Sequence, residues 1–206
     1  MKETKIRLSG PEMDLMCDAG IILMKNGVLQ KVKALLESLQ DAMQAHTPAA
    51  GLLPAAAFST PPKISKGENY LGLPYLVLDY PRRFTPGHIC AVRTLFWWGH
   101  FFSSTLLLSG DYRDAFLPRA GWVYDRLREG PYYMGIHEDP WIHHFEPSNY
   151  TPVASLSRAA FGDACRALPH IKIAAKWPLS DWPLAANHLW ENWKFLVQLM
   201  NEPILL

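Results

Sequence analysis

Residues 94–110 read TLFWWGHFFSSTLLLSG and contain no Asp, Glu, Lys or Arg. This charge-free stretch is shorter than the roughly 20 residues that a membrane-spanning helix needs, and Arg93 and Asp111 bound it tightly. As one strand it would run for about 50 Å, which is too long for a compact domain unless the chain bends at Gly99. We therefore predict that Gly99 divides the stretch and that His100–Leu108 forms a strand.

The residues before this stretch predict a strand and then a helix. Residues 73–80 form an apolar run between Gly72 and Pro81, which is typical of a buried strand. Thr85 and Pro86 suit the N-cap and the first position of a helix, and apolar residues follow at 89, 92 and 96. This spacing predicts a helix that ends at Gly99, where glycine is a natural stop.

The residues after it alternate between helical and extended patterns. We expect a helix over residues 112–128 with a break near Pro118, a short helix over 157–168 and a strand over 170–176. The last helix follows Ser180, a suitable cap. Its expected buried stripe comprises Trp182, Ala186, Leu189, Trp193, Val197 and Met200.

The first 45 residues predict two helices separated by Gly27. The first is expected to pack one face into the core, and that face consists of Met13, Met16, Cys17, Ile21 and Met24. The second is expected to bury the stripe Val28, Val32, Leu35, Leu36, Leu39 and Met43. Residues 47–62 are rich in Ala and Pro and predict an irregular connection, and residues 63–69 predict a solvated loop.

Together these patterns predict one α+β domain over residues 1–206. It would consist of a helical N-terminal region, 1–46, the Ala/Pro-rich connection, 47–62, and an α+β body, 63–206. The body would hold an antiparallel or mixed sheet of four to five strands. An N-terminal helix pair, a middle helix and a long C-terminal amphipathic helix would pack against this sheet.

The amino-acid composition and net charge indicate which classes of partner to expect. Apolar residues make up 49% of the 206 residues, enough for a sizeable core, and the formal charge is +1. Because nucleic acids and anionic membranes usually require clustered Lys and Arg, we expect neither partner. The three cysteines are widely spaced and the N-terminal residues do not resemble a secretory signal, so we expect a soluble protein in the cytoplasm.

Residues 132–146, YYMGIHEDPWIHHFE, concentrate histidines and carboxylates around an Asp-Pro turn. Imidazole and carboxylate groups bind transition metals and transfer protons near neutral pH. A hairpin with a four-residue loop on a type I turn would pair Gly135 with His144. On that register His137, His144 and Glu146 share one face and His143 lies on the other.

Two functions remain open on these observations. The first is a non-enzymatic binding or interaction module, with a homo-oligomer as one form and with its small-molecule ligand unknown. The second is a small enzyme that uses His137, His144 and Glu146, with His143 in reserve, for metal-assisted or general acid–base chemistry. The second reading admits a divalent metal as cofactor. The common nucleotide-binding and serine-hydrolase motifs are absent from the sequence.

Overall fold

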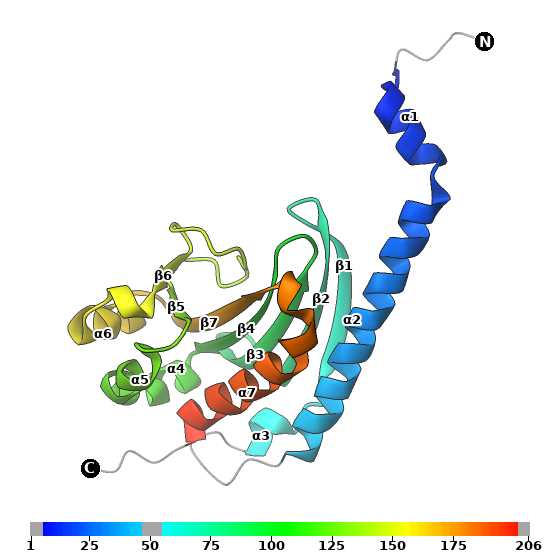
Figure 1. Ribbon diagram of the computed structural model, residues 1–206. Helices are drawn as coiled ribbons and strands as arrows, with labels where there is room; N and C mark the ends of the chain where they lie inside the picture. Colours follow the sequence, from blue (N-terminus) through cyan, green and yellow to red (C-terminus); the bar gives the residue numbers. More distant parts are fainter. Residues whose placement is uncertain (1–5, 47–54, 202–206) are drawn as a thin grey trace.

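The computed structural model describes residues 6–46 and 55–201, and it contains one antiparallel sheet of seven strands in the order β1-β2-β3-β4-β7-β5-β6. The strands are β1 (Lys63–Tyr70), β2 (Leu73–Thr85), β3 (His88–Trp97), β4 (Phe101–Ser109), β5 (Tyr132–Gly135), β6 (Tyr150–Pro152) and β7 (His170–Pro178). The predicted α+β class is confirmed (Figure 1). The sheet has more strands than the four to five expected, and every pairing is antiparallel.

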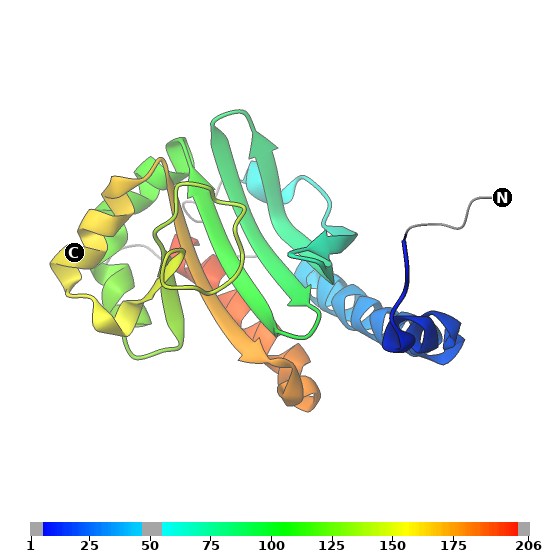
Figure 2. The same ribbon diagram turned by 90° about the horizontal axis from the view of Figure 1, so that it is seen from above.

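Helices cover one face of this sheet, and an irregular segment covers part of the other. The helices are α1 (Gly10–Cys17), α2 (Ala19–Ala45), α3 (Ala55–Phe58), α4 (Asp111–Phe116), α5 (Ala120–Leu127), α6 (Arg158–Ala167) and α7 (Trp182–Asn201). Figure 2 shows α2 and α7 behind the sheet and residues 136–149 in front of it. Among the described residues, no helix is both long enough and apolar enough to cross a membrane.

The main core lies between the sheet and the helices α2 and α7. Alternate residues of each central strand face it, as Leu76, Leu78 and Tyr80 do in β2. The stripe of α2 that is buried consists of Leu29, Val32, Leu36, Leu39 and Met43. In α7 the buried residues include Leu189, Trp193, Val197 and Met200 as predicted, whereas Trp182 and Ala186 are exposed and Ala185 is buried instead.

The predicted helix from Thr85 is wrong, because this segment forms the turn between β2 and β3. Thr85 pairs with His88, so Pro86 and Gly87 are the two turn residues. Proline suits the first of these positions, and Gly87 has the positive φ, 78°, that a type II turn requires at the second. The strand predicted at His100–Leu108 is confirmed as β4, and Gly99, with φ 74°, lies in the turn before it.

Two further expectations on the N-terminal side are corrected. Gly27 lies inside α2, and the helix break is at Asp18, whose carboxylate accepts a hydrogen bond from the Gly20 amide at 2.8 Å. Residues 63–69, expected as a loop, belong to the edge strand β1. The apolar face predicted for the first helix is not buried, since every residue from 8 to 24 is exposed. Half of the predicted connection, residues 47–54, lies outside the described residues.

Candidate functional site

The predicted hairpin at 132–146 is wrong, because β5 pairs with a strand further along the chain. Gly135 lies opposite Tyr150, so residues 136–149 form a long loop between β5 and β6. The Asp-Pro turn forms inside this loop, where the Trp141 amide donates to the Asp139 carboxylate at 2.8 Å. The register that would place His137, His144 and Glu146 on one face of a hairpin is therefore not present.

The structure separates the predicted site residues. His137 accepts a hydrogen bond from the Asp139 amide at 2.9 Å, and His144 Nδ1 lies 3.1 Å from the Tyr70 hydroxyl. Glu146 is exposed, and its backbone carbonyl accepts from the residue 149 and 150 amides at 2.8 Å. Within the described part of the chain, no group of three His, Cys, Asp or Glu side chains is arranged to hold a metal ion.

His143, which was predicted to point away, belongs instead to a buried polar cluster. Its Nε2 atom lies 3.2 Å from the guanidinium of Arg93 in β3. Arg93 makes a bidentate ion pair with Asp79 of β2, at 2.8 and 2.9 Å, because the two residues are direct cross-strand partners. Burial and the neighbouring Arg93 charge hold the pKa of His143 well below its usual value, so its ring is neutral at pH 7.

Lys172 of β7 completes this group, which we call the loop-covered cluster (Asp79, Arg93, His143 and Lys172). Its side chain is 1% exposed and its ammonium lies 4.7 Å from the centre of the Tyr150 ring. It passes over Gly135, where an added Cβ would lie only 2.8 Å from the Lys172 Cβ. Burial lowers the pKa of Lys172 to about 7, against the opposing charge of Asp139.

Side chains from the sheet and from the loop itself hold the loop over the cluster. The Lys172 ammonium donates to the Ile142 carbonyl. The Tyr70 hydroxyl accepts from the amides of residues 143 and 144, at 2.6 and 3.2 Å. Asn149 is buried and donates to the Ile142 and His144 carbonyls, at 3.1 and 2.6 Å. The loop consequently covers the cluster, although the Arg93 side chain stays 19% exposed.

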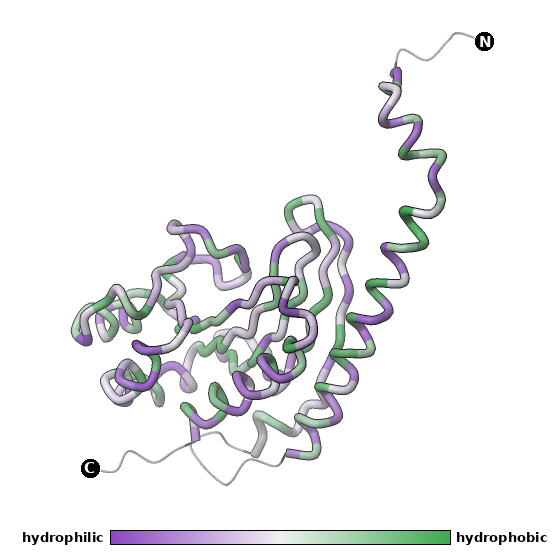
Figure 3. The backbone as a smooth tube through the Cα atoms, viewed as in Figure 1, coloured by the Kyte–Doolittle hydropathy of each residue, from purple (hydrophilic) through white to green (hydrophobic). Residues whose placement is uncertain are grey.

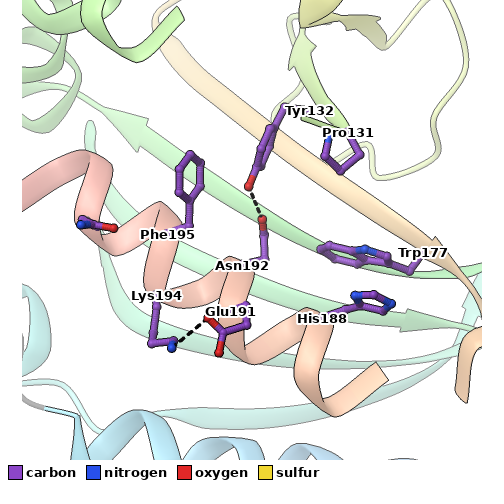
Figure 4. A pocket seen from close by; sticks show the side chains of 9 residues that line it. Pro131, Tyr132, Trp177, His188, Glu191, Asn192, Lys194 and Phe195 are labelled. Atoms are coloured by element: carbon purple, nitrogen blue, oxygen red, sulfur yellow. Dashed lines mark hydrogen bonds and ion pairs between the residues drawn. The ribbon is translucent and has the colours of Figure 1, made fainter. Parts of the chain in front are cut away.

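A second location, which we call the α7 pocket, is open to solvent. It has a volume of about 510 Å³ and lies between α7 and the strands β5 and β7 (Figure 4). Two stacked aromatic pairs form its walls: Tyr132 with Phe195, 5.2 Å between centroids, and Trp177 with His188, 5.5 Å. The full lining comprises Pro131, Tyr132, Trp177, His188, Glu191, Asn192, Lys194, Phe195 and Gln198.

Asn192 lies between the two aromatic pairs (Figure 4). It is only 5% exposed, and its Oδ1 accepts a hydrogen bond from the Tyr132 hydroxyl at 2.9 Å. Burial raises the pKa of Tyr132, which keeps this hydroxyl protonated as a donor. Among the described residues the Asn192 Nδ2 has no hydrogen-bond partner. At the rim, Lys194 and Glu191 form an ion pair at 2.9 Å.

Sequence reasoning missed the residues of the α7 pocket. Glu191 and Lys194 show only as a polar helix face, Tyr132 shows only as a strand residue, and Trp177 follows the strand predicted over 170–176. One signal was present: His188 and Asn192 are four residues apart and therefore share a face of α7. Their meeting with Tyr132 depends on strand order, since β5 follows β7 in the sheet although it precedes it in the chain.

Comparison with protein-family models, with curated proteins and with solved structures finds no match to this chain. A function must therefore be inferred from the chemistry of the two locations. The α7 pocket has apolar walls and a buried amide, which are features of a site for a small ligand. The loop-covered cluster has a lysine whose pKa lies near neutrality, which is a property of acid–base groups.

Proposed function

We propose that this chain is a binding module that takes a small planar molecule in the α7 pocket. The supporting observation is the buried Asn192 amide between two aromatic pairs in an open pocket of about 510 Å³. A planar ring in that position contacts aromatic faces of the Tyr132–Phe195 and Trp177–His188 pairs. The ligand is thus a flat, largely apolar ring rather than a flexible chain.

The amide of Asn192 defines a second property of the ligand. Its oxygen is already used by Tyr132, whereas its Nδ2 donor has no partner among the described residues. A buried donor without a partner costs about 1–3 kcal/mol. Nδ2 has less than 1 Å² of exposed surface, so a ligand reaches it only when the Asn192 side chain turns toward the α7 pocket. A ring nitrogen or carbonyl that then accepts from Nδ2 removes this cost, so heterocycles with an acceptor bind better than carbocycles of the same shape.

The test is calorimetric titration of the full chain with purines, pyridines and quinolines, each matched to a carbocyclic analogue. We expect heterocycles to bind and their analogues to bind about tenfold or more weakly. Asn192→Asp keeps the acceptor for Tyr132 and removes the amide donor, so it should abolish this preference. Asn187→Asp, on the exposed side of the same helix, is the matched control.

Two results would contradict this proposal. If no member of the panel binds at millimolar concentration, or if Asn192→Asp binds every member as the unmodified chain does, the α7 pocket is not the site we describe. Perturbation of NMR signals of α7 and β7 by a bound heterocycle would separate binding in this pocket from binding elsewhere. Signals of β1 and α2 then serve as the internal reference.

Acid–base or nucleophilic chemistry at the loop-covered cluster is a second candidate function, and one observation favours it. A lysine with a pKa of about 7 is largely deprotonated just above neutral pH, and a neutral amine is a base and a nucleophile. Because Lys172 is 1% exposed, this chemistry requires the loop 136–149 to open.

Reductive methylation at pH 7 followed by mass spectrometry tests this second function. Exposed lysines are largely protonated at this pH, so a reachable Lys172 should be modified first. Modification of Lys31 and Lys33 on the surface of α2 while Lys172 stays unmodified would show that the cluster is closed to small reagents. That result would leave Lys172 with a structural role alone.

A further inference from the structure

The N-terminal helices project beyond the sheet (Figure 1), and hydrophobic residues recur along them (Figure 3). Every residue from 8 to 24 is exposed. Of the sixteen large hydrophobic residues that are exposed in the described chain, nine lie between residues 8 and 28: Leu8, Met13, Leu15, Met16, Ile21, Ile22, Leu23, Met24 and Val28. Monomeric proteins rarely expose so continuous an apolar surface, which is typical of an interaction site.

The apolar stripe that packs α2 against the body continues into this exposed part. Ile22, Leu29, Leu36 and Met43 are spaced by seven residues, so they lie on nearly the same face of the helix. The last three are buried, whereas Ile22 is 55% exposed. The same face therefore runs from covered to uncovered at the point where α2 passes the edge of the sheet.

The charges of this region are arranged symmetrically about its apolar centre. Residues 10–18 carry Glu12, Asp14 and Asp18 and no basic residue. Residues 19–24 carry no charge. Residues 25–33 carry Lys25, Lys31 and Lys33 and no acidic residue. An anionic membrane would be repelled by the acidic segment, whereas a second copy in antiparallel orientation places each acidic segment opposite a basic one.

We propose that two copies of this chain associate through an antiparallel pairing of residues 10–33, centred on residues 19–24. This two-fold arrangement brings Glu12 and Asp18 of one copy to the side of α2 that carries Lys33 and Lys25 of the other, because these two lysines lie close to the face of Ile22 and Leu29. It is isologous, so one set of contacts is made twice.

In this arrangement α1 of the second copy binds in a groove on the body. It has a volume of about 480 Å³ and is lined by Asn26, Leu29, Gln30, Lys33, Ile64, Lys66 and Leu76. In the antiparallel register, residues 26–33 lie opposite residues 10–17, which are α1. The groove is apolar at Leu29, Ile64 and Leu76 and basic at Lys33 and Lys66. Lys33 pairs with Glu37, whereas Glu68 is shared by Lys66 and Lys25, so the groove keeps a net positive charge. It therefore complements a helix that is apolar and acidic.

Light scattering coupled to gel filtration tests the association. We expect the full chain to run at twice its chain mass, and Ile22→Glu with Leu23→Glu to run as a monomer with an unchanged near-UV circular dichroism spectrum. Leu184→Glu, at an exposed apolar residue of α7, is the matched control and should stay dimeric. A monomeric unmodified chain at 100 μM (a concentration on the order of 100 Kd for a micromolar dimer) overturns the proposal.

Two variants with reversed charges test the orientation. Glu12→Lys with Asp14→Lys, and separately Lys31→Glu with Lys33→Glu, should each be monomeric alone, because like charges then face each other. Mixed together they should form a heterodimer. Two monomers that stay apart on mixing contradict the antiparallel register. Binding of the unmodified monomer to phosphatidylcholine–phosphatidylglycerol vesicles would assign the apolar surface to a membrane and also overturn the proposal.

The exposed thiol of Cys17 gives a direct geometric readout, because Cys90 and Cys165 are buried. In the antiparallel register Cys17 lies opposite Asn26 of the second copy. Asn26→Cys should therefore form an intermolecular disulfide with Cys17 under mild oxidation. A rapid Cys17–Cys17 disulfide in the unmodified chain, with none to the introduced thiol, would indicate parallel pairing and contradict the arrangement.

Discussion

Lys172 shows how a single residue determines local geometry and pH response. Its side chain needs the space that Gly135 leaves, and its ammonium holds the loop by donating to the Ile142 carbonyl. Folding removes this ammonium from water, which is why the pKa falls to about 7. The hydrogen bond from Lys172 to the loop therefore requires that a charge leave water, and the free energy that this costs depends on pH.

This cost leads to a stability prediction for Lys172→Met. In the unfolded chain a lysine titrates near pH ~10.4, so between pH 7 and that value the unfolded state binds the extra proton. The contribution of Lys172 to the free energy of unfolding, taken as the difference between the unmodified chain and the variant, should then rise with pH by about 1.4 kcal/mol per unit. The variant should lack this rise in urea denaturation at pH 6–10, and Lys31→Met should retain it. Parallel curves for Lys172→Met and the unmodified chain would contradict the prediction.

A second residue prediction concerns the ion pair beneath the loop. Asp79→Asn should lower the free energy of unfolding by about 3–5 kcal/mol, because it leaves the Arg93 charge largely buried without its partner. Replacing both residues by Leu should recover most of the loss. Asp125→Asn, which breaks an exposed pair with Arg158, should cost less than about 1 kcal/mol. Equal losses for the two Asp→Asn variants would show that burial of the pair is unimportant.

At the scale of the element, the loop 136–149 is held by polar contacts and by Phe145, which packs on the apolar cluster of Val77, Leu95, Trp97 and Phe101. Asn149 makes two of the polar contacts. Asn149→Ala should increase amide exchange in residues 142–146 by roughly thirtyfold, since it removes two hydrogen bonds and each is worth about 1 kcal/mol. Hydrogen-exchange mass spectrometry measures this, with the β4 and β7 amides as the internal reference. Equal acceleration in β7 would mean that the variant loosens the whole sheet.

Elements with local signals were predictable from the sequence, and those defined by distant partners were not. The helix α6 begins where Ser157 caps it, and β7 and α7 show clear periodicity. The helix predicted from Thr85 was wrong because proline suits both the start of a helix and a turn. The following Gly87, with its positive φ, favours the turn. The hairpin Tyr70–Leu73 has Leu71 at a positive φ of 50°, and the sequence gives no signal for this backbone conformation.

The candidate sites were harder to predict than the fold, for the same reason. His143 was identified as a candidate, but its partner Arg93 lies fifty positions earlier and is brought near by the order of the strands. The ligand set His137, His144 and Glu146 rested on one assumed register, and the pairing of Gly135 with Tyr150 removed it. Side chains that contact across a sheet cannot be paired before the sheet order is known.

At the scale of the whole molecule, the prediction of one domain can be tested by calorimetry. The core joins α2, α7 and all five long strands, so we expect residues 55–201 and the buried half of α2 to unfold in one transition. The calorimetric and van't Hoff enthalpies should then agree. Two separated transitions, or a circular dichroism melt that precedes the loss of tertiary signal, would indicate that α2 unfolds independently.

The two edges of the sheet limit how copies of this chain can assemble into larger structures. β6 has only three residues, and the other edge, β1, carries Lys63, Lys66 and Glu68. Short or charged edges resist pairing with further strands. Fibril growth by strand addition is therefore disfavoured at both ends, even though the central strands β2, β3, β4 and β7 are long and largely apolar. At concentrations where other chains with such strands form amyloid, this chain should remain dispersed.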